Sequence, residues 1–172
     1  MMCSVLHTKM KIDIDKLPEE MKCDIKETLL TLELVKLMVS KMKYFTSKER
    51  IILLDVISSI EKYMEDIKTI ETIQEFTHQL KILDDVYSKL KENNKTLNLD
   101  LTKYKKYYDK YIEPCVLMWS IGAISDMTRK TKTPSVEEFG EYIKNHLLPM
   151  LALQIIGAIA TMIEQRTFYK AS

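Results

Sequence analysis

The sequence predicts an all-α protein, a compact single-domain bundle of about seven helices around a central apolar helix. Only 3 Gly and 4 Pro occur in 172 residues, whereas a β-rich fold needs both residue types in its turns. Leu, Ile, Lys, Glu and Met are plentiful, and most of these are strong helix formers. This length is most simply one domain, and it is sufficient to bury a real core.

Three segments are expected along the chain: a poorly ordered or extended N-terminus (1–17), a helical domain (18–166) and a tail (167–172). Pro18 suits the first position of a helix that we expect to run to about residue 44. Its apolar stripe comprises Ile25, Leu29, Leu32, Val35, Val39 and Met42, and a wider set adds Leu30, Leu34, Leu37 and Met38. So broad an apolar surface predicts packing on more than one neighbour.

Two further helices follow. Thr46 and Glu49 have the spacing of a capping box, which predicts a second helix from there to about residue 67. Thr69 is the expected cap of a third helix, which Asn93 and Asn94 would end. The apolar residues of this third helix follow a regular three- and four-residue spacing: Ile73, Phe76, Leu80, Leu83, Tyr87 and Leu90.

The C-terminal half begins with a helix capped by Asp100, in which Tyr and Lys alternate over 103–111. Such a pattern is found on single-stranded nucleic-acid platforms. We instead expect Leu101, Tyr104, Tyr108 and Ile112 to face the core with the lysines in solvent, because the net charge is only +1. Prolines then predict the starts of three further helices, at Pro114, Pro134 and Pro149.

Two apolar runs, 116–124 and 149–163, fit either the core of a protein or a membrane. A spanning helix needs about 20 apolar residues, and the second run is short and contains Gln154. We therefore interpret both runs as core and expect 116–124 to be the central helix. The alternative is a tail anchor formed by 149–163 in a cytosol-facing, mitochondrial membrane.

No pattern of catalytic or metal-binding residues is present in the sequence. His7, His78 and His146 lie far apart, and none has a second ligand three or four residues away. Cys115 and Ser120 lack a base nearby in sequence, and no glycine-rich phosphate loop occurs. We expect a protein without enzymatic activity, cofactor, metal or nucleic-acid partner. Three unclustered cysteines are typical of reduced thiols, which places the chain in the cytoplasm.

The C-terminal half resembles the Bcl-2 family, in particular its divergent viral members. Residues 111–130 look like the segment that spans the first homology motif and the central helix, and 141–149 look like the helix that leads into the second. The resemblance covers about 102–163. The chain departs from the family at the first motif, where Glu113-Pro114-Cys115-Val116 replaces Asn-Trp-Gly-Arg and removes the arginine that pairs with the ligand's aspartate.

A looser match concerns the BH3 pattern of four apolar positions with an aspartate before the fourth. Phe76, Leu80, Leu83 and Val86 fit the apolar positions, and Asp84-Asp85 precede the last of them. Asp84 occupies the place where the family has a small residue.

The resemblance implies an interaction protein of a virus that sequesters a host partner and inhibits apoptosis. The partner would be an amphipathic BH3-type helix bound in a groove. The residues expected to line this groove are Leu80, Leu83, Tyr87, Tyr104, Tyr108 and Trp119. Two alternatives remain open: a Bcl-2-like inhibitor of innate immune signalling that binds an adaptor protein, and a tail-anchored protein with a cytosolic helical domain.

Overall fold

The computed structural model describes the backbone of residues 25–128, 141 and 143–171, and the side chains of 25–117, 141 and 143–167. The described part is built from helices, which confirms the all-α prediction. It contains six α-helices: α2 (Ile25–Lys41), α3 (Ser47–Asp66), α4 (Ile73–Glu92), α5 (Asn94–Leu97), α6 (Thr102–Thr128) and α8 (Leu148–Ala171). A 3₁₀ turn, η3 (Ile67–Thr69), and a π-helical turn, η4 (Ile143–Leu147), complete it.

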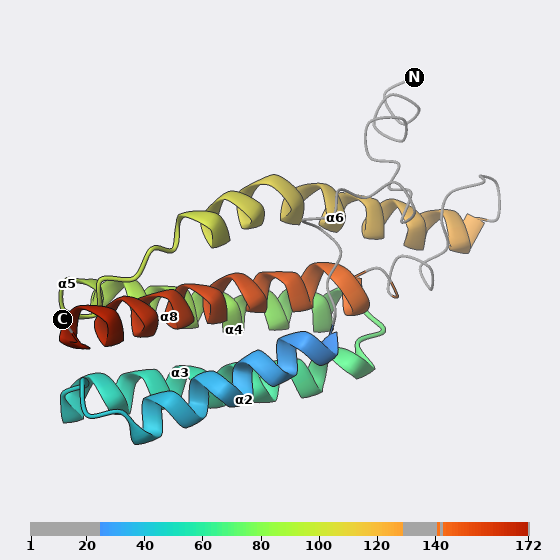
Figure 1. Cartoon of the computed structure of the whole chain (residues 1–172). Coiled ribbons are helices and arrows are strands. Elements are labelled where there is room, and N and C mark those ends of the chain that lie inside the picture. Colours follow the sequence, from blue (N-terminus) through green and yellow to red (C-terminus); the bar gives the residue numbers. More distant parts are fainter. Residues whose placement is uncertain (1–24, 129–140, 142, 172) are drawn as a thin grey trace.

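The helices lie roughly side by side along one long axis (Figure 1). Helices α2 and α3 form a hairpin on one side, α6 lies along the other side, and α4 and α8 lie between them. Helix α8 contacts α2, α3 and α6, and α4 contacts α3 and α6. The chain therefore places its last described helix among helices from both of its halves.

Helix α8 occupies the centre of the core. Its buried apolar residues point in several directions around the helix: Leu148, Met150, Leu151, Ala152, Ile155, Ile156, Ile159, Met162 and Ile163. The sequence analysis gave the central position to 116–124 instead. Leu117 is 41% exposed, and the side chains of 118–124 lie outside the described residues. Of the two apolar runs, the second is the one that the described structure surrounds.

The turn between α2 and α3 forms as the sequence predicts. The Glu49 amide donates to Thr46 Oγ1 (3.1 Å), and the Thr46 amide donates to Glu49 Oε1 (3.0 Å), which confirms the capping box. The guanidinium of Arg50 donates to the carbonyl oxygens of Val39, Ser40 and Met42 at 2.6–3.1 Å. Arg50 thereby satisfies carbonyls that the end of α2 leaves without an intrahelical partner.

The third helix starts later than the sequence suggested. Thr72 caps α4 by accepting from the Glu75 amide (3.2 Å), so the prediction that Thr69 is the cap was wrong. Thr69 instead belongs to η3, which extends the path of α3 by three residues. Both threonines stand three or more residues before an apolar position, and local sequence alone does not distinguish them. At its other end α4 stops at Glu92, with Asn93 as its cap.

The expected break at Pro114 is absent. Helix α6 continues through this residue from Thr102 to Thr128, so the two helices predicted here are one. A proline inside a helix loses one hydrogen bond and crowds the carbonyl four residues earlier, at a cost of about 3 kcal/mol. Ile112 and Cys115 flank Pro114 and are both buried. Packing on both sides of the proline holds the helix on its course and offsets this cost.

Pro149 also fails to separate two helices. Turn η4 leads directly into α8, and Pro149 is the second residue of that helix. A π-helical turn carries one extra residue in its ring, a local widening that often accompanies an interruption of the helical hydrogen bonds. The buried hydroxyl of Tyr63 donates to the Leu148 carbonyl (2.7 Å) and ties α3 to this junction. Helix α8 then runs to Ala171, so it includes most of the segment expected as a tail (167–172).

Arg166, near the end of α8, joins three parts of the chain. Its guanidinium forms a two-pronged ion pair with Glu49 (3.1 and 2.7 Å). The same group donates to the carbonyl oxygens of Tyr44 (3.3 Å) and Thr96 (2.7 Å) and lies over the Phe45 ring. These contacts lock the α2–α3 turn and the α4–α6 connection onto α8.

Candidate functional site

The residues expected to line a partner groove come from α4 and α6, which pack against each other. The ring of Tyr104 lies 5.3 Å from that of Tyr87 and 5.7 Å from that of Tyr108. Leu83 and Leu80 lie about one and two turns before Tyr87 along α4, and both are buried. The structure thus brings five of the six residues to one seam, hereafter the α4–α6 seam. The side chain of Trp119 lies outside the described residues.

The α4–α6 seam is closed in this structure. Leu83 is 0% exposed and Tyr104 is 2% exposed, whereas Tyr87 and Tyr108 are half-buried at its edge. A docked helix would reach Leu83 and Tyr104 only after α6 moved away from α4. Because these contacts are mainly between apolar and aromatic side chains, an apolar partner helix could replace them one for one.

The electrostatics of the α4–α6 seam keep its tyrosines neutral. Burial, with a contribution from a hydrogen bond to the Asp84 carboxylate, raises the pKa of Tyr108 to about 12. Burial raises the pKa of Tyr104 further still, and its hydroxyl has no hydrogen-bond partner among the described residues. A neutral phenol without a base beside it performs no acid–base chemistry at ordinary pH, so the seam has the character of a binding surface.

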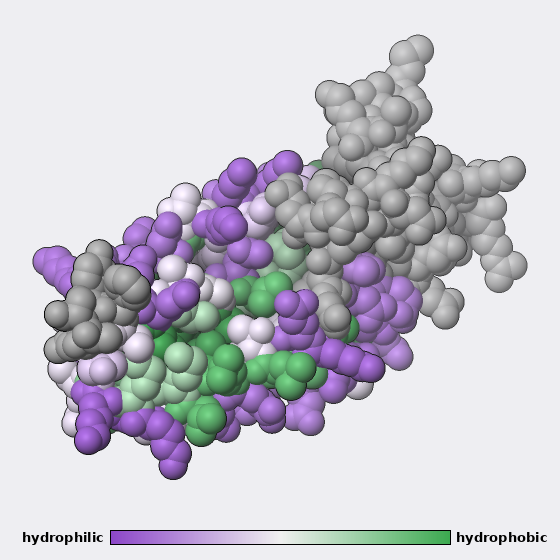
Figure 2. Space-filling model, in the orientation of Figure 1, coloured by the Kyte–Doolittle hydropathy of each residue, from purple (hydrophilic) through white to green (hydrophobic). Residues whose placement is uncertain are grey.

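A second feature was not recognised as a surface from the sequence. Leu30, Leu34 and Leu37 are 67%, 57% and 55% exposed, and they form what we call the leucine stripe of α2. They were expected to pack on a further neighbour, but they point away from the helices that α2 contacts. Figure 2 shows the resulting apolar surface over α2. The signal was present in the sequence as the excess width of the apolar face, and its interpretation as core was wrong.

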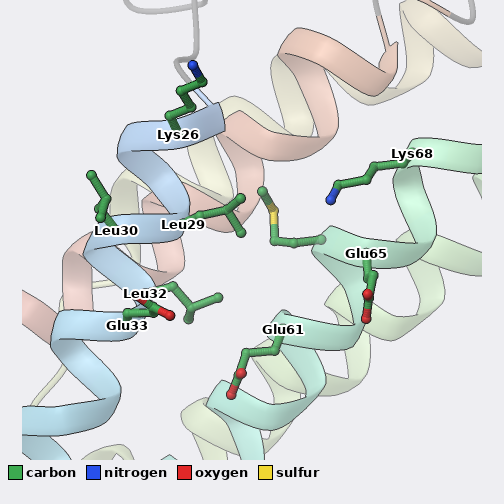
Figure 3. A pocket seen from close by; sticks show the side chains of 9 residues that line it. Lys26, Leu29, Leu30, Leu32, Glu33, Glu61, Glu65 and Lys68 are labelled. Atoms are coloured by element: carbon green, nitrogen blue, oxygen red, sulfur yellow. The ribbon is translucent and has the colours of Figure 1, made fainter.

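An open cavity of ≈ 560 Å³ lies beside the leucine stripe, between α2 and α3. Leu29 and Leu32 project into it, whereas Leu30 points outward at its edge (Figure 3). The charged lining residues are Lys26, Glu33, Glu61, Glu65 and Lys68. Glu61 also pairs with Lys36 across the two helices (3.1 Å). The cavity therefore has an apolar floor and a charged rim.

The chemistry available to the described residues is limited. Among them, no group of three or more His, Cys, Asp or Glu side chains is placed to hold a metal ion. Cys115 is buried, and burial raises the pKa of its thiol to about 12. A second cavity, of ≈ 380 Å³, lies between the start of α6 and α8 and is lined by polar residues such as Gln154, Thr161 and Lys103.

One helical stretch in the described part of the chain, Ile143–Thr167, is long and apolar enough to cross a membrane. Of its most apolar window, 61% is buried inside the protein. The core helix of a water-soluble protein has the same length and composition, so this feature is weak evidence for a membrane anchor.

Comparison of the chain with protein-family models, with curated proteins and with solved structures finds no match.

Proposed function

We propose that this chain is a non-enzymatic interaction protein, similar to the divergent viral Bcl-2-like regulators, that sequesters a host protein and inhibits apoptosis. The bound segment would be an amphipathic BH3-type helix, docked between α4 and α6. The observation that carries the proposal is the row of Tyr87, Tyr104 and Tyr108 along this seam. Aromatic side chains bury large areas with little loss of conformational entropy, and they dominate the energetics of many protein interfaces.

The position of the tyrosines suggests how binding would start. Tyr87 and Tyr108 are half-buried at the edge of the α4–α6 seam, where an incoming helix can contact them before α6 moves. Leu80 and Leu83 lie deeper and would become accessible as α6 separates from α4. Binding would then cost the contacts between α4 and α6, and the affinity would report the surplus over that cost.

Titration of the purified full chain against a panel of fluorescently labelled BH3 peptides tests this proposal. Tyr108→Glu places a charge at the edge of the seam, and we expect it to weaken binding at least tenfold. Tyr111→Glu is the matched control, because Tyr111 is also half-buried on α6 but stacks on Tyr107 instead. We expect this control to bind within about twofold of the unchanged protein. If no peptide binds at about 100 µM, helix-in-groove binding is refuted.

An alternative within the same fold is an inhibitor of innate immune signalling that binds an adaptor protein. The exposed leucine stripe favours some protein contact outside the α4–α6 seam. Affinity capture of a purified adaptor that survives Tyr108→Glu but is lost in Leu34→Glu would support this alternative and argue against the BH3 site.

The tail-anchor alternative depends on the length and apolar character of Ile143–Thr167. Fractionation of cells that express the chain with and without residues 149–172 distinguishes the two roles of α8. Because most α8 residues are buried against α2, α3 and α6, we expect the full chain in the soluble fraction and the truncated chain in aggregates. Full-length protein that resists extraction from membranes by salt and alkali would overturn the core assignment.

A further inference from the structure

The leucine stripe has the spacing of a helix–helix interface. Leu30, Leu34 and Leu37 are separated by four and then three residues, which is the d–a–d order of a coiled-coil heptad. The opposite side of α2 already packs in the core through Thr28, Leu32, Val35 and Val39. Helix α2 therefore has two apolar faces, and only one of them is covered by the described chain.

Charges at the two ends of the leucine stripe favour a particular occupant. Glu27 lies three residues before Leu30, and Lys41 lies four residues after Leu37, so both continue the same heptad pattern. Both side chains are exposed. A second α2 that runs antiparallel would bring Glu27 opposite Lys41 of the other copy, at both ends of the contact. A parallel pair would set like charges opposite each other, which is unfavourable.

We propose that the leucine stripe is a homodimer interface in which α2 packs antiparallel on α2 of a second copy. The two-fold axis passes close to Leu34, so the two Leu34 side chains lie beside each other. Leu30 then lies opposite Leu37 of the second copy, and Leu37 opposite Leu30 of the second copy. Such a contact is isologous, because each copy contributes the same surface. The antiparallel arrangement also aligns the helix dipoles favourably.

The size of this contact determines its strength. Helix α2 has 17 residues, which corresponds to a length of about 25 Å. A contact made mainly by one helix pair falls at the low end of protein interfaces, below about 1,200 Å² in total. The dimer is therefore weak and forms in the micromolar range of concentration.

The dimer interface is separate from the α4–α6 seam. Helices α2 and α6 lie on opposite sides of the molecule, with α8 and α4 between them (Figure 1). Dimerisation leaves both seams accessible, and one dimer can engage two partner helices. On a partner that is itself dimeric or held on a surface, this raises the apparent affinity without any new contact. The inference does not depend on the proposed function, because self-association is measured without a partner.

Sedimentation velocity of the full chain between about 5 and 200 µM measures the dimer directly. We expect the sedimentation coefficient to rise with concentration toward that of a dimer. Leu34→Glu places two like charges beside the two-fold axis, and we expect the dissociation constant to increase at least tenfold. Ile51→Glu is the matched control: Ile51 is 69% exposed on α3, outside the leucine stripe. We expect this control to dimerise like the unchanged protein.

Charge exchange tests the orientation of the helices. Glu27→Lys alone and Lys41→Glu alone each place like charges at both ends and should weaken the dimer by severalfold. The double variant E27K/K41E restores opposite charges in an antiparallel pair and should recover the original dissociation constant. Far-ultraviolet circular dichroism confirms that each variant is folded. A chain that stays monomeric at about 200 µM, an equal effect of L34E and I51E, or failure of the double variant to recover each overturns the proposal.

Discussion

Removal of the Arg166 guanidinium is expected to be among the most damaging single changes near the surface of this protein. Arg166 donates four hydrogen bonds, two to the Glu49 carboxylate and two to carbonyl oxygens of Tyr44 and Thr96. The Glu49 side chain is 9% exposed and that of Arg166 is 20% exposed, so solvent screens this pair only weakly. Arg166→Met retains the apolar stem of the side chain and leaves Glu49 with its capping contacts alone.

The expected loss of stability follows from these contacts. A net hydrogen bond to a charged group contributes about 1.5–3 kcal/mol, and breaking a fully buried pair costs about 3–5 kcal/mol. Allowing for the partial exposure of Arg166, we expect Arg166→Met to lower the free energy of unfolding by about 3 kcal/mol. For a domain of this size the melting temperature would fall by about 6–12 °C. Urea denaturation followed by circular dichroism measures the free energy, and a thermal scan measures the temperature.

A matched control separates this ion pair from a general effect of charge removal. Lys105 and Asp109 form an ion pair on α6 in which both side chains are more than half exposed. Lys105→Met should change stability by no more than about 0.5 kcal/mol. A double-mutant cycle with Glu49→Gln and Arg166→Met should give a coupling of at least about 1 kcal/mol. Equal effects of the two methionine variants, or additive effects in the cycle, would refute the reasoning.

The same pair predicts how stability depends on pH. The hydrogen bonds from Arg166 hold the pKa of the Glu49 carboxyl below its ordinary value of 4.5. The unfolded chain therefore binds a proton at this group at a higher pH than the folded chain does. The contribution to stability is fully present above pH 4.5 and disappears as the pH falls through the lower folded pKa. Arg166→Met should flatten this acid limb of a plot of unfolding free energy against pH.

Three further changes have defined outcomes. Tyr63→Phe removes the buried hydrogen bond to the Leu148 carbonyl and should cost about 1 kcal/mol in urea denaturation, whereas a variant at the same stability as the original protein would contradict that bond. Asn98 has a φ of 56°, so Asn98→Val should destabilise by about 1–2 kcal/mol while Asn98→Gly stays within about 0.5 kcal/mol; equal losses would argue against the left-handed backbone. In a C3S/C23S background, Cys115 should react with a thiol reagent at pH 8 much more slowly in the native than in the urea-unfolded state, because burial raises its pKa to about 12; equal rates would show that the thiol is accessible.

Features that depend on neighbouring residues were predictable from the sequence. The Thr46–Glu49 capping box needs only four consecutive residues, and the structure reproduces both of its hydrogen bonds. The apolar spacing of 73–90 likewise reports one face of one helix, and Phe76, Leu83 and Leu90 are completely buried there. In both cases the residues that decide the outcome lie within a few turns of one another.

Features that depend on distant residues were not predictable in this way. A proline reads as a helix start because it is tolerated at the first position, but Pro114 lies inside α6, where packing of Ile112 and Cys115 holds the helix. The contact of Arg166 with Glu49 joins residues 117 positions apart. Neither residue carries a sequence signal that names its partner.

The leucine stripe shows a different limit. A row of leucines on a helix looks the same in sequence whether it faces the core or solvent, because the residue types are identical. Only the burial of the opposite face through Leu32, Val35 and Val39 shows that Leu30, Leu34 and Leu37 lie on the outside. The α4–α6 seam was anticipated more closely, since it joins two helices that follow each other in the chain.

The central position of α8 has a consequence for how the protein is made. A ribosome releases the chain from the N-terminus onward, and α2, α3, α4 and α6 all precede α8. The apolar faces of these helices have no core to pack on until α8 has emerged. Arg166, which joins the α2–α3 turn to the α4–α6 connection, arrives later still. The nascent protein therefore holds adhesive surfaces open for most of its synthesis, and its early helices are candidates for chaperone binding until the last one closes the structure.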